Sequence, residues 1–100
     1  MDNQLQKDMW NGRAGASWVK HNSLLDELLS EPGHRCMELF SLPASAQVLD
    51  VGCGCGNQTF DWASRLDPSC TITGVDVSEP MLALAEDLRS ANQSSLQANV

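Results

Sequence analysis

The hydrophobic pattern of the first 44 residues is mainly helical. Residues 16–30 place apolar side chains on one side at spacings of seven, three and four residues, which predicts a helix. The apolar positions of that side are Trp18, Leu25, Leu28 and Leu29. Pro32 and Gly33 are expected to end this helix, and a second short helix is predicted over residues 35–40.

The pattern changes at residue 47. Strands are predicted over residues 47–51, 71–76 and 95–98, and helices over residues 57–66 and from the N-cap Ser78 onward. The first strand is apolar on both faces, as a buried strand is. Alternating strands and helices favour parallel strands joined by right-handed crossovers. We therefore predict an α/β fold: two leading helices, then βαβαβ, forming the N-terminal half of a Rossmann-like doubly wound parallel sheet that is incomplete.

Composition and charge narrow the class of protein. Hydrophobic residues make up 42% of the 100 residues, as in an ordinary globular protein, and the formal net charge is −7. The negative charge opposes binding to nucleic acid, so we expect no nucleic-acid partner. No apolar run approaches the roughly 20 residues of a membrane span, and the polar N-terminus does not resemble a secretory signal. We expect a cytoplasmic protein without membrane association.

The four cysteines do not indicate a metal site. Cys53 and Cys55 are one residue apart in a glycine run, a spacing unlike that of paired zinc ligands. We therefore expect no metal, and the two thiols are expected to be small side chains of the loop.

Glycines at alternate positions follow the first predicted strand. Asp50 lies near the end of that strand, and Gly52, Gly54 and Gly56 follow it. Glycine is needed where φ is positive or where a ligand lies against the main chain, and we expect Gly52 and Gly54 to support a ligand in this way. Asp76 comes 20 residues after Gly56, at the end of the second strand, where a carboxylate can accept both hydroxyls of a ribose.

The dinucleotide fingerprint G-x-G-x-x-G is not present in this loop. Counting from Gly52 places Asn57 at the third glycine, and counting from Gly54 places Thr59 there. The third glycine permits close packing beside a pyrophosphate. The loop is therefore a poor match for a nicotinamide or flavin dinucleotide.

Residues 48–56 resemble motif I of the class I S-adenosylmethionine (SAM) dependent methyltransferases. Residues 73–81 resemble the next block of that family, in which the acidic residue holds the ribose and a following bulky residue packs on adenine. Residues 96–100 are similar to the end of the family's third strand, with Asn99 in place of the usual Asp. SAM has no pyrophosphate, and its sulfonium and amino groups suit Asp50.

The resemblance implies a set of cofactor-binding residues. They are Asp50, Gly52, Cys53, Gly54, Gly56, Asp76, Val77, Met81, Asn99 and Val100. It assigns no catalytic residue, because in this fold the acceptor-binding and base residues usually come from the fourth strand onward or from inserted segments.

The same resemblance implies the domain organisation and the activity. Residues 1–44 are expected to be a helical cap, and residues 45–100 the first half of the SAM-binding domain. We expect SAM-dependent methyl transfer to a small-molecule acceptor that the sequence does not identify, and the residues around Trp10 resemble the leading helices of ubiquinone-biosynthesis methyltransferases. We expect this chain to be the N-terminal half of an enzyme, inactive and aggregation-prone alone, with an unknown oligomeric state. Two alternatives remain: a nucleotide-binding oxidoreductase of the NAD/FAD type and a non-catalytic SAM-binding fragment.

Several side chains have two interpretations from sequence alone. Trp10 and Trp18 are either core residues, which we favour, or a lid over the cofactor. His21 and Asn22 face either solvent, which we favour, or a cofactor pocket. Met81 either packs in the core or contacts adenine. The first dozen residues are polar around Met9 and Trp10, and Asn11-Gly12 and Gly15 are expected to break the chain. Asp50 either faces the ligand or fixes the loop, and both roles can coexist.

Overall fold

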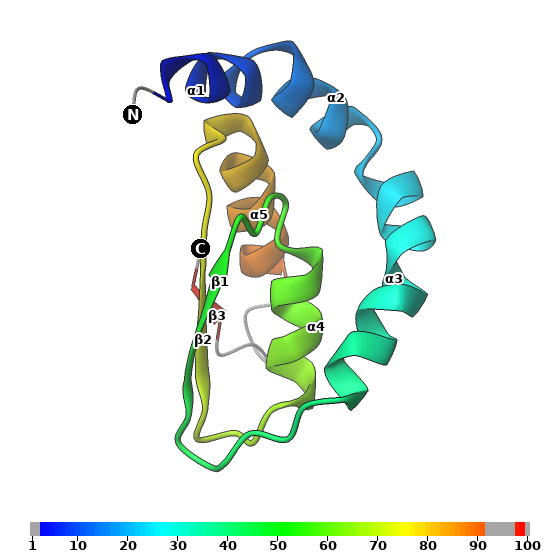
Figure 1. The fold of residues 1–100 in the computed structure, drawn as a ribbon, viewed down its shortest axis with the longest axis vertical. Helices are drawn as coiled ribbons and strands as arrows, with labels where there is room; N and C mark the ends of the chain where they lie inside the picture. Colours follow the sequence, from blue (N-terminus) through cyan, green and yellow to red (C-terminus); the bar gives the residue numbers. More distant parts are fainter. Residues whose placement is uncertain (1–2, 92–97, 100) are drawn as a thin grey trace.

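The computed structural model describes residues 3–91 and 98–99. The elements in chain order are α1 (Gln4–Asn11), α2 (Arg13–Lys20), α3 (Asn22–Glu38), β1 (Gln47–Val51), α4 (Asn57–Arg65), β2 (Thr71–Val75), α5 (Glu79–Ala91) and β3 (Ala98–Asn99) (Figure 1). β3 begins at Ala98, the last position of the third predicted strand, and the predicted positions 95–97 lie outside the described residues.

The three strands form a parallel sheet in the order β1-β2-β3. Gln47 pairs with Thr71 at one end of the β1–β2 ladder, and Val51 pairs with Val75 at the other. Since α4 connects β1 to β2 and α5 connects β2 to β3, the carboxyl ends of the strands meet at one edge of the sheet. The predicted Rossmann-like βαβαβ arrangement is confirmed.

The core lies between β2 and the helices on one face of the sheet (Figure 1). Ile72 on β2 and Ala85 on α5 are almost completely buried. The other face is open: Leu49 is 62% exposed and Val51 75% exposed, and none of the described helices covers them. The prediction that residues 47–51 form a buried strand is therefore wrong for the described structure, because β1 is an edge strand covered on one face only.

Three helices, rather than the predicted two, precede the sheet. The polar segment before Gly12 forms α1, and Gly15 lies inside α2 instead of breaking the chain. A Cβ on Gly15 would lie 1.9 Å from the Trp10 carbonyl oxygen and 2.8 Å from the Ser78 hydroxyl oxygen. Gly15 thus allows α2 to approach α1 and the start of α5, and this close packing explains a glycine within a helix.

Pro32 and Gly33 do not end a helix, since α3 continues through both to Glu38. A proline inside a helix costs about 3 kcal/mol because its ring clashes and a hydrogen bond is lost. Gly33 is buried where α3 meets α4, and a Cβ there would lie 2.8 Å from Nε2 of Gln58. Met37, on the next turn, is also buried. Packing of the turns that follow the proline therefore keeps the helix continuous. The helix predicted over residues 16–30 is instead interrupted at His21, so its first part lies in α2, and α3 joins its second part to the helix predicted over residues 35–40.

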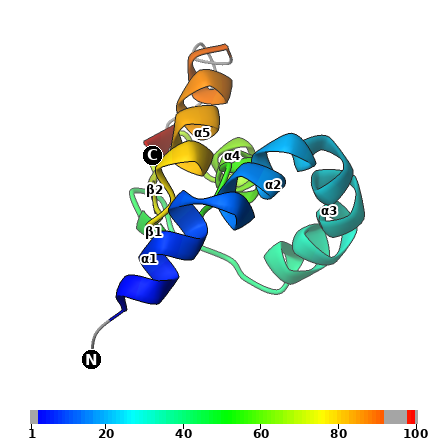
Figure 2. The same cartoon turned by 90° about the horizontal axis from the view of Figure 1, so that it is seen from above.

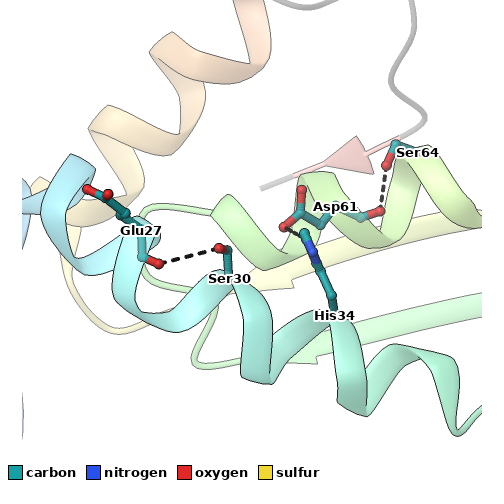
Figure 3. A network of polar contacts seen from close by, with 5 residues as sticks. All are labelled: Glu27, Ser30, His34, Asp61 and Ser64. Carbon is teal, nitrogen blue, oxygen red and sulfur yellow. Dashed lines mark hydrogen bonds and ion pairs between the residues drawn. The ribbon is translucent and has the colours of Figure 1, made fainter.

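Seen from above, α1, α2 and α3 form an arc beside α4 and α5 (Figure 2). A polar pair fixes the far part of this arc: Nε2 of His34 lies 3.0 Å from Oδ2 of Asp61 (Figure 3). The hydroxyls of Ser30 and Ser64 instead donate within their own helices, to the carbonyls of Glu27 and Asp61. The His34–Asp61 pair is thus the side-chain link in this network that joins α3 to α4.

Within residues 3–91 and 98–99, no helix is both long and apolar enough to cross a membrane.

Candidate functional site

A cavity of about 830 Å³ lies between the carboxyl ends of β1 and β2 and the leading helices. Eight of the ten predicted cofactor-binding residues line it, namely Asp50, Gly52, Cys53, Gly54, Gly56, Asp76, Val77 and Met81. The backbone of Asn99 lies in β3, but its side chain and all of Val100 lie outside what the structure describes. The adenine contact expected of these two residues therefore stays a prediction.

The loop between β1 and α4 needs its glycines for two different reasons. The loop glycines have positive φ angles of 75° (Gly52), 59° (Gly54) and 85° (Gly56). Residues that carry a side chain rarely adopt this backbone conformation. A Cβ on Gly54 would lie 2.8 Å from Cε of Met81, so its missing side chain makes room for α5. A Cβ on Gly52 would meet no atom within 4 Å. Gly52 is therefore the loop glycine whose missing side chain leaves open space beside the cavity.

Asp76 holds the loop and also faces the cavity. Its Oδ2 accepts a hydrogen bond from the Gly54 amide at 2.8 Å, and its Oδ1 accepts one from the Ser78 amide at 2.8 Å. A carboxylate oxygen accepts more than one hydrogen bond, so both oxygens can also accept from a ligand hydroxyl. The geometry is thus compatible with the predicted ribose contact, and it adds a structural role that the sequence did not indicate.

Asp50 is tied to α4. Its Oδ2 accepts a hydrogen bond from the hydroxyl of Thr59 at 2.7 Å, and Thr59 is completely buried. The β2 residue Gly74 allows this packing, because a Cβ there would lie 2.8 Å from Sγ of Cys53 and 3.2 Å from Oγ1 of Thr59. Asp50 therefore fixes the start of α4 beneath the loop, while it still lines the cavity.

The electrostatic environment of the loop is negative. Burial, reinforced by the charges of Asp50 and Asp76, raises the pKa of the Cys53 thiol to about 11. Burial and Asp76 also raise the pKa of the Cys55 thiol. Both thiols are consequently neutral at pH 7, which makes them poor nucleophiles. The same field favours a positively charged group in the cavity.

Alkylation should distinguish the thiols. At pH 8 a thiol with a pKa of about 11 is a thiolate in roughly one molecule per thousand, so we expect iodoacetamide to modify exposed Cys36 at least about tenfold faster than Cys53. Peptide mass spectrometry over time gives both rates. Asp76→Asn should accelerate modification of Cys53 while leaving Cys36 unchanged. Equal rates at the two cysteines in the unmodified chain would contradict the raised pKa.

The end of α1 is fastened to the cavity rim by Asn11. Its Nδ2 donates to the Val77 carbonyl at 2.9 Å, and its Oδ1 accepts from the Glu79 amide at 2.8 Å. Ser78 adds a link, because its hydroxyl donates to the Trp10 carbonyl and also accepts from the Met81 amide at 3.4 Å as the N-cap of α5. Sequence reasoning took Asn11 for a turn residue and missed this role, which depends on packing between distant segments.

The two tryptophans belong to the cavity wall. Trp10 and Trp18 meet edge to face, with ring centroids 6.3 Å apart, and both line the cavity. Trp10 is only partly buried and Trp18 is 36% exposed, so the favoured core interpretation is wrong. The alternative of a lid over the cofactor stays a prediction. Met81 is buried in the first turn of α5, as its core interpretation requires, and it also lines the cavity, where its adenine contact stays a prediction.

The neighbouring polar residues His21 and Asn22 have different environments. His21 is exposed, as favoured from sequence. Asn22 lines the cavity, so the favoured solvent position is wrong for this residue. Its Oδ1 accepts a hydrogen bond from Nδ2 of Asn57 at 3.1 Å, which draws the first turn of α3 toward α4 and the cavity. Leu25, Asp26 and Leu29 follow on the same side of α3 and also line the cavity.

Comparison with known proteins adds independent findings. Residues 48–100 match the family model described as a methyltransferase domain. A trans-aconitate 2-methyltransferase of Variovorax paradoxus (strain S110) is 40% identical over 58 residues, which are 58% of this chain and 22% of the relative. A demethylmenaquinone methyltransferase of Bacillus licheniformis is 38% identical over 52 residues, which are 52% of this chain and 22% of the relative. The chain thus spans about a fifth of the length of these curated relatives.

A solved structure supports the fold. The crystal structure of a SAM dependent methyltransferase from Aquifex aeolicus matches with a TM-score of 0.58 and 22% identity, over 68% of this chain and 36% of that one. The family model covers more than half of the chain, and the glycine loop and Asp76 lie within the matched residues. The chain therefore belongs to the methyltransferase domain family of the class I SAM-dependent methyltransferases.

Proposed function

We propose that the cavity binds SAM and that the chain supplies the methyl-donor side of a site acting on a small-molecule acceptor. The observation that carries this proposal is the arrangement of Gly52 and Asp76. The glycine leaves open space against the main chain, and the carboxylate lies beside the same loop with acceptor capacity to spare. A nucleoside with two ribose hydroxyls fits that combination.

Other lining residues suit the remaining parts of SAM. Val77 and Met81 offer apolar surface for adenine beyond Asp76. Asn57 and Gln58 line the cavity at the N-terminus of α4, where the positive end of the helix dipole favours a carboxylate. The negative field that raises the pKa of Cys53 favours the sulfonium and ammonium groups. The residues that line the cavity are therefore suited to each charged and apolar part of SAM.

Bound SAM supplies a methyl group on a sulfonium whose leaving group departs neutral. The protein's contribution is then mainly alignment of the acceptor and exclusion of water. Trp10 and Trp18 provide an apolar wall for this purpose on the side of the cavity away from the sheet. None of the described residues is assigned as a base for the acceptor.

A dinucleotide is disfavoured by the packing at the two candidate positions for a third glycine. Asn57 uses its amide to join α4 to α3, and Thr59 is completely buried with its hydroxyl on Asp50. Neither position leaves the main chain free for close approach to a pyrophosphate. An oxidoreductase is thus a weaker candidate.

Calorimetric titration of the full chain tests the proposal. We expect SAM and S-adenosylhomocysteine to bind with Kd values of about 1–100 μM, and NADH at least about tenfold more weakly. The reason is that the loop offers open space at Gly52 but lacks the third glycine that would let a pyrophosphate approach the main chain. Tighter binding of NADH than of SAM would reverse the assignment, and binding of neither would refute a nucleotide site.

A further inference from the structure

The cavity is larger than its proposed cofactor requires. A molecule of the size of SAM occupies roughly half of a space of 830 Å³. The residues assigned to SAM come from the strand ends, the glycine loop and the starts of α4 and α5. The cavity-lining residues of α2 and α3, which we call the α2–α3 wall, have no part in that assignment.

The α2–α3 wall combines apolar side chains with one carboxylate. Its apolar members are Trp18, Leu25 and Leu29, and its charged member is Asp26. Asp26 is half-buried, and within residues 3–91 and 98–99 no hydrogen bond or ion pair engages its carboxylate. A cationic partner strongly stabilises the ionised form of a half-buried carboxylate that lies beside apolar side chains.

The charges of the residues around the whole cavity also favour a cationic ligand. Its described lining contains the carboxylates Asp26, Asp50 and Asp76, and no Lys, Arg or His. SAM brings a net charge of +1, so the described lining with its cofactor keeps an excess of negative charge. A polycarboxylate such as the trans-aconitate named for one relative would meet repulsion from this lining, with no described cation to bind it.

We propose that the α2–α3 wall is an acceptor subsite that selects a cationic small molecule with an apolar body. The body packs against Trp18, Leu25 and Leu29, and a protonated amine is bound by Asp26. Asp26 is then the specificity-determining residue of the subsite. This inference rests on the proposed function, because it takes the other half of the cavity to be filled by SAM.

The test uses two probes with the same aromatic body and opposite charge. The full chain, saturated with S-adenosylhomocysteine at pH 7, is titrated with phenethylamine and with 3-phenylpropionate, and binding is followed by ligand-observed NMR. We expect the amine to bind about tenfold or more tightly than the carboxylate, because the charge at Asp26 attracts one and repels the other. Asp26→Asn should reduce this ratio to less than about threefold while leaving S-adenosylhomocysteine affinity within about twofold.

Glu27→Gln is the matched control. It removes the same charge from the neighbouring residue of α3, which is exposed and does not line the cavity, so the ratio should stay as in the unmodified chain. Equal binding of the probes, tighter binding of 3-phenylpropionate, or no binding of either overturns the inference. An unchanged ratio in Asp26→Asn overturns the role of Asp26. Failure of S-adenosylhomocysteine to bind refutes the proposed function and the inference with it, whereas normal binding without discrimination refutes the inference alone.

Discussion

Alanine at position 76 is expected to weaken SAM binding by about 2–4 kcal/mol, or roughly 30- to 1000-fold in Kd. Asp76 lies beside the glycine loop at the end of β2, and each of its oxygens can accept one more hydrogen bond than the protein supplies. Without the carboxylate, two ribose hydroxyls would lose charged acceptors inside the cavity. Calorimetric titration of the full-length chain with SAM measures the loss.

The same substitution removes the hydrogen bonds from the Gly54 and Ser78 amides, so part of the loss could come from a displaced loop. Comparing S-adenosylhomocysteine with its 2′,3′-dideoxy analogue separates the two effects. The unmodified chain should prefer the natural compound, and Asp76→Ala should abolish the preference. Asp87→Ala, which removes the same charge from the exposed side of α5, should alter neither affinity. If the unmodified chain binds both compounds equally, Asp76 does not hold the ribose.

The part of the chain that the sequence predicted well is the part with local signals. β1 has the predicted bounds, β2 ends one residue early, and the loop glycines have the positive φ angles that their spacing indicated. These features depend on short-range sterics: alternation in a strand, a cap at Ser78, and backbone conformations open to glycine. Eight predicted site residues line one cavity for the same reason, because parallel strand ends meet at one edge.

The leading helices were predicted less well, because their limits depend on contacts between distant residues. Gly15 and Pro32 are helix breakers by local propensity, yet both lie inside helices. Gly15 is needed for the approach of α2 to Ser78, and the helix around Pro32 is held by packing against Gln58. The sequence alone does not show that residues of α5 and α4 lie beside Gly15 and Pro32. It therefore could not show that tertiary packing keeps the helices continuous at these two residues.

The wall of the cavity formed by α3 was missed for a related reason. Whether Asn22 and Asp26 face solvent or the cavity depends on how α3 is rotated and positioned against α4. One contact that fixes this position is the Asn22–Asn57 amide pair. The other is the His34–Asp61 pair (Figure 3), which lies beyond Pro32 along α3. Helical periodicity identifies one side of α3, but it does not say what that side faces.

Asparagine at position 52 is expected to reduce SAM affinity by at least about 100-fold while the chain stays folded. Gly52 has a φ of 75°, and asparagine is the side chain that tolerates positive φ best, so the conformational strain should be about 1 kcal/mol or less. The new side chain would start in a space that holds no protein atom within 4 Å and would occupy volume needed by the ligand. The melting temperature by circular dichroism and the Kd by calorimetry report the two effects separately.

Ser45→Asn provides the matched control for the backbone effect. Ser45 also has a positive φ, 63°, but it lies in the exposed segment before β1 and does not line the cavity. Asparagine there should leave both the melting temperature and SAM affinity unchanged, because the conformation is again one that it tolerates. A large loss of affinity at position 52 with none at position 45 would show that the ligand needs the empty volume beside Gly52. Undiminished SAM binding by a folded Gly52→Asn variant would show instead that the cofactor does not lie against this glycine. The conformation of the loop would then be explained by its contact with Met81 and its hydrogen bonds to the Val75 carbonyl alone.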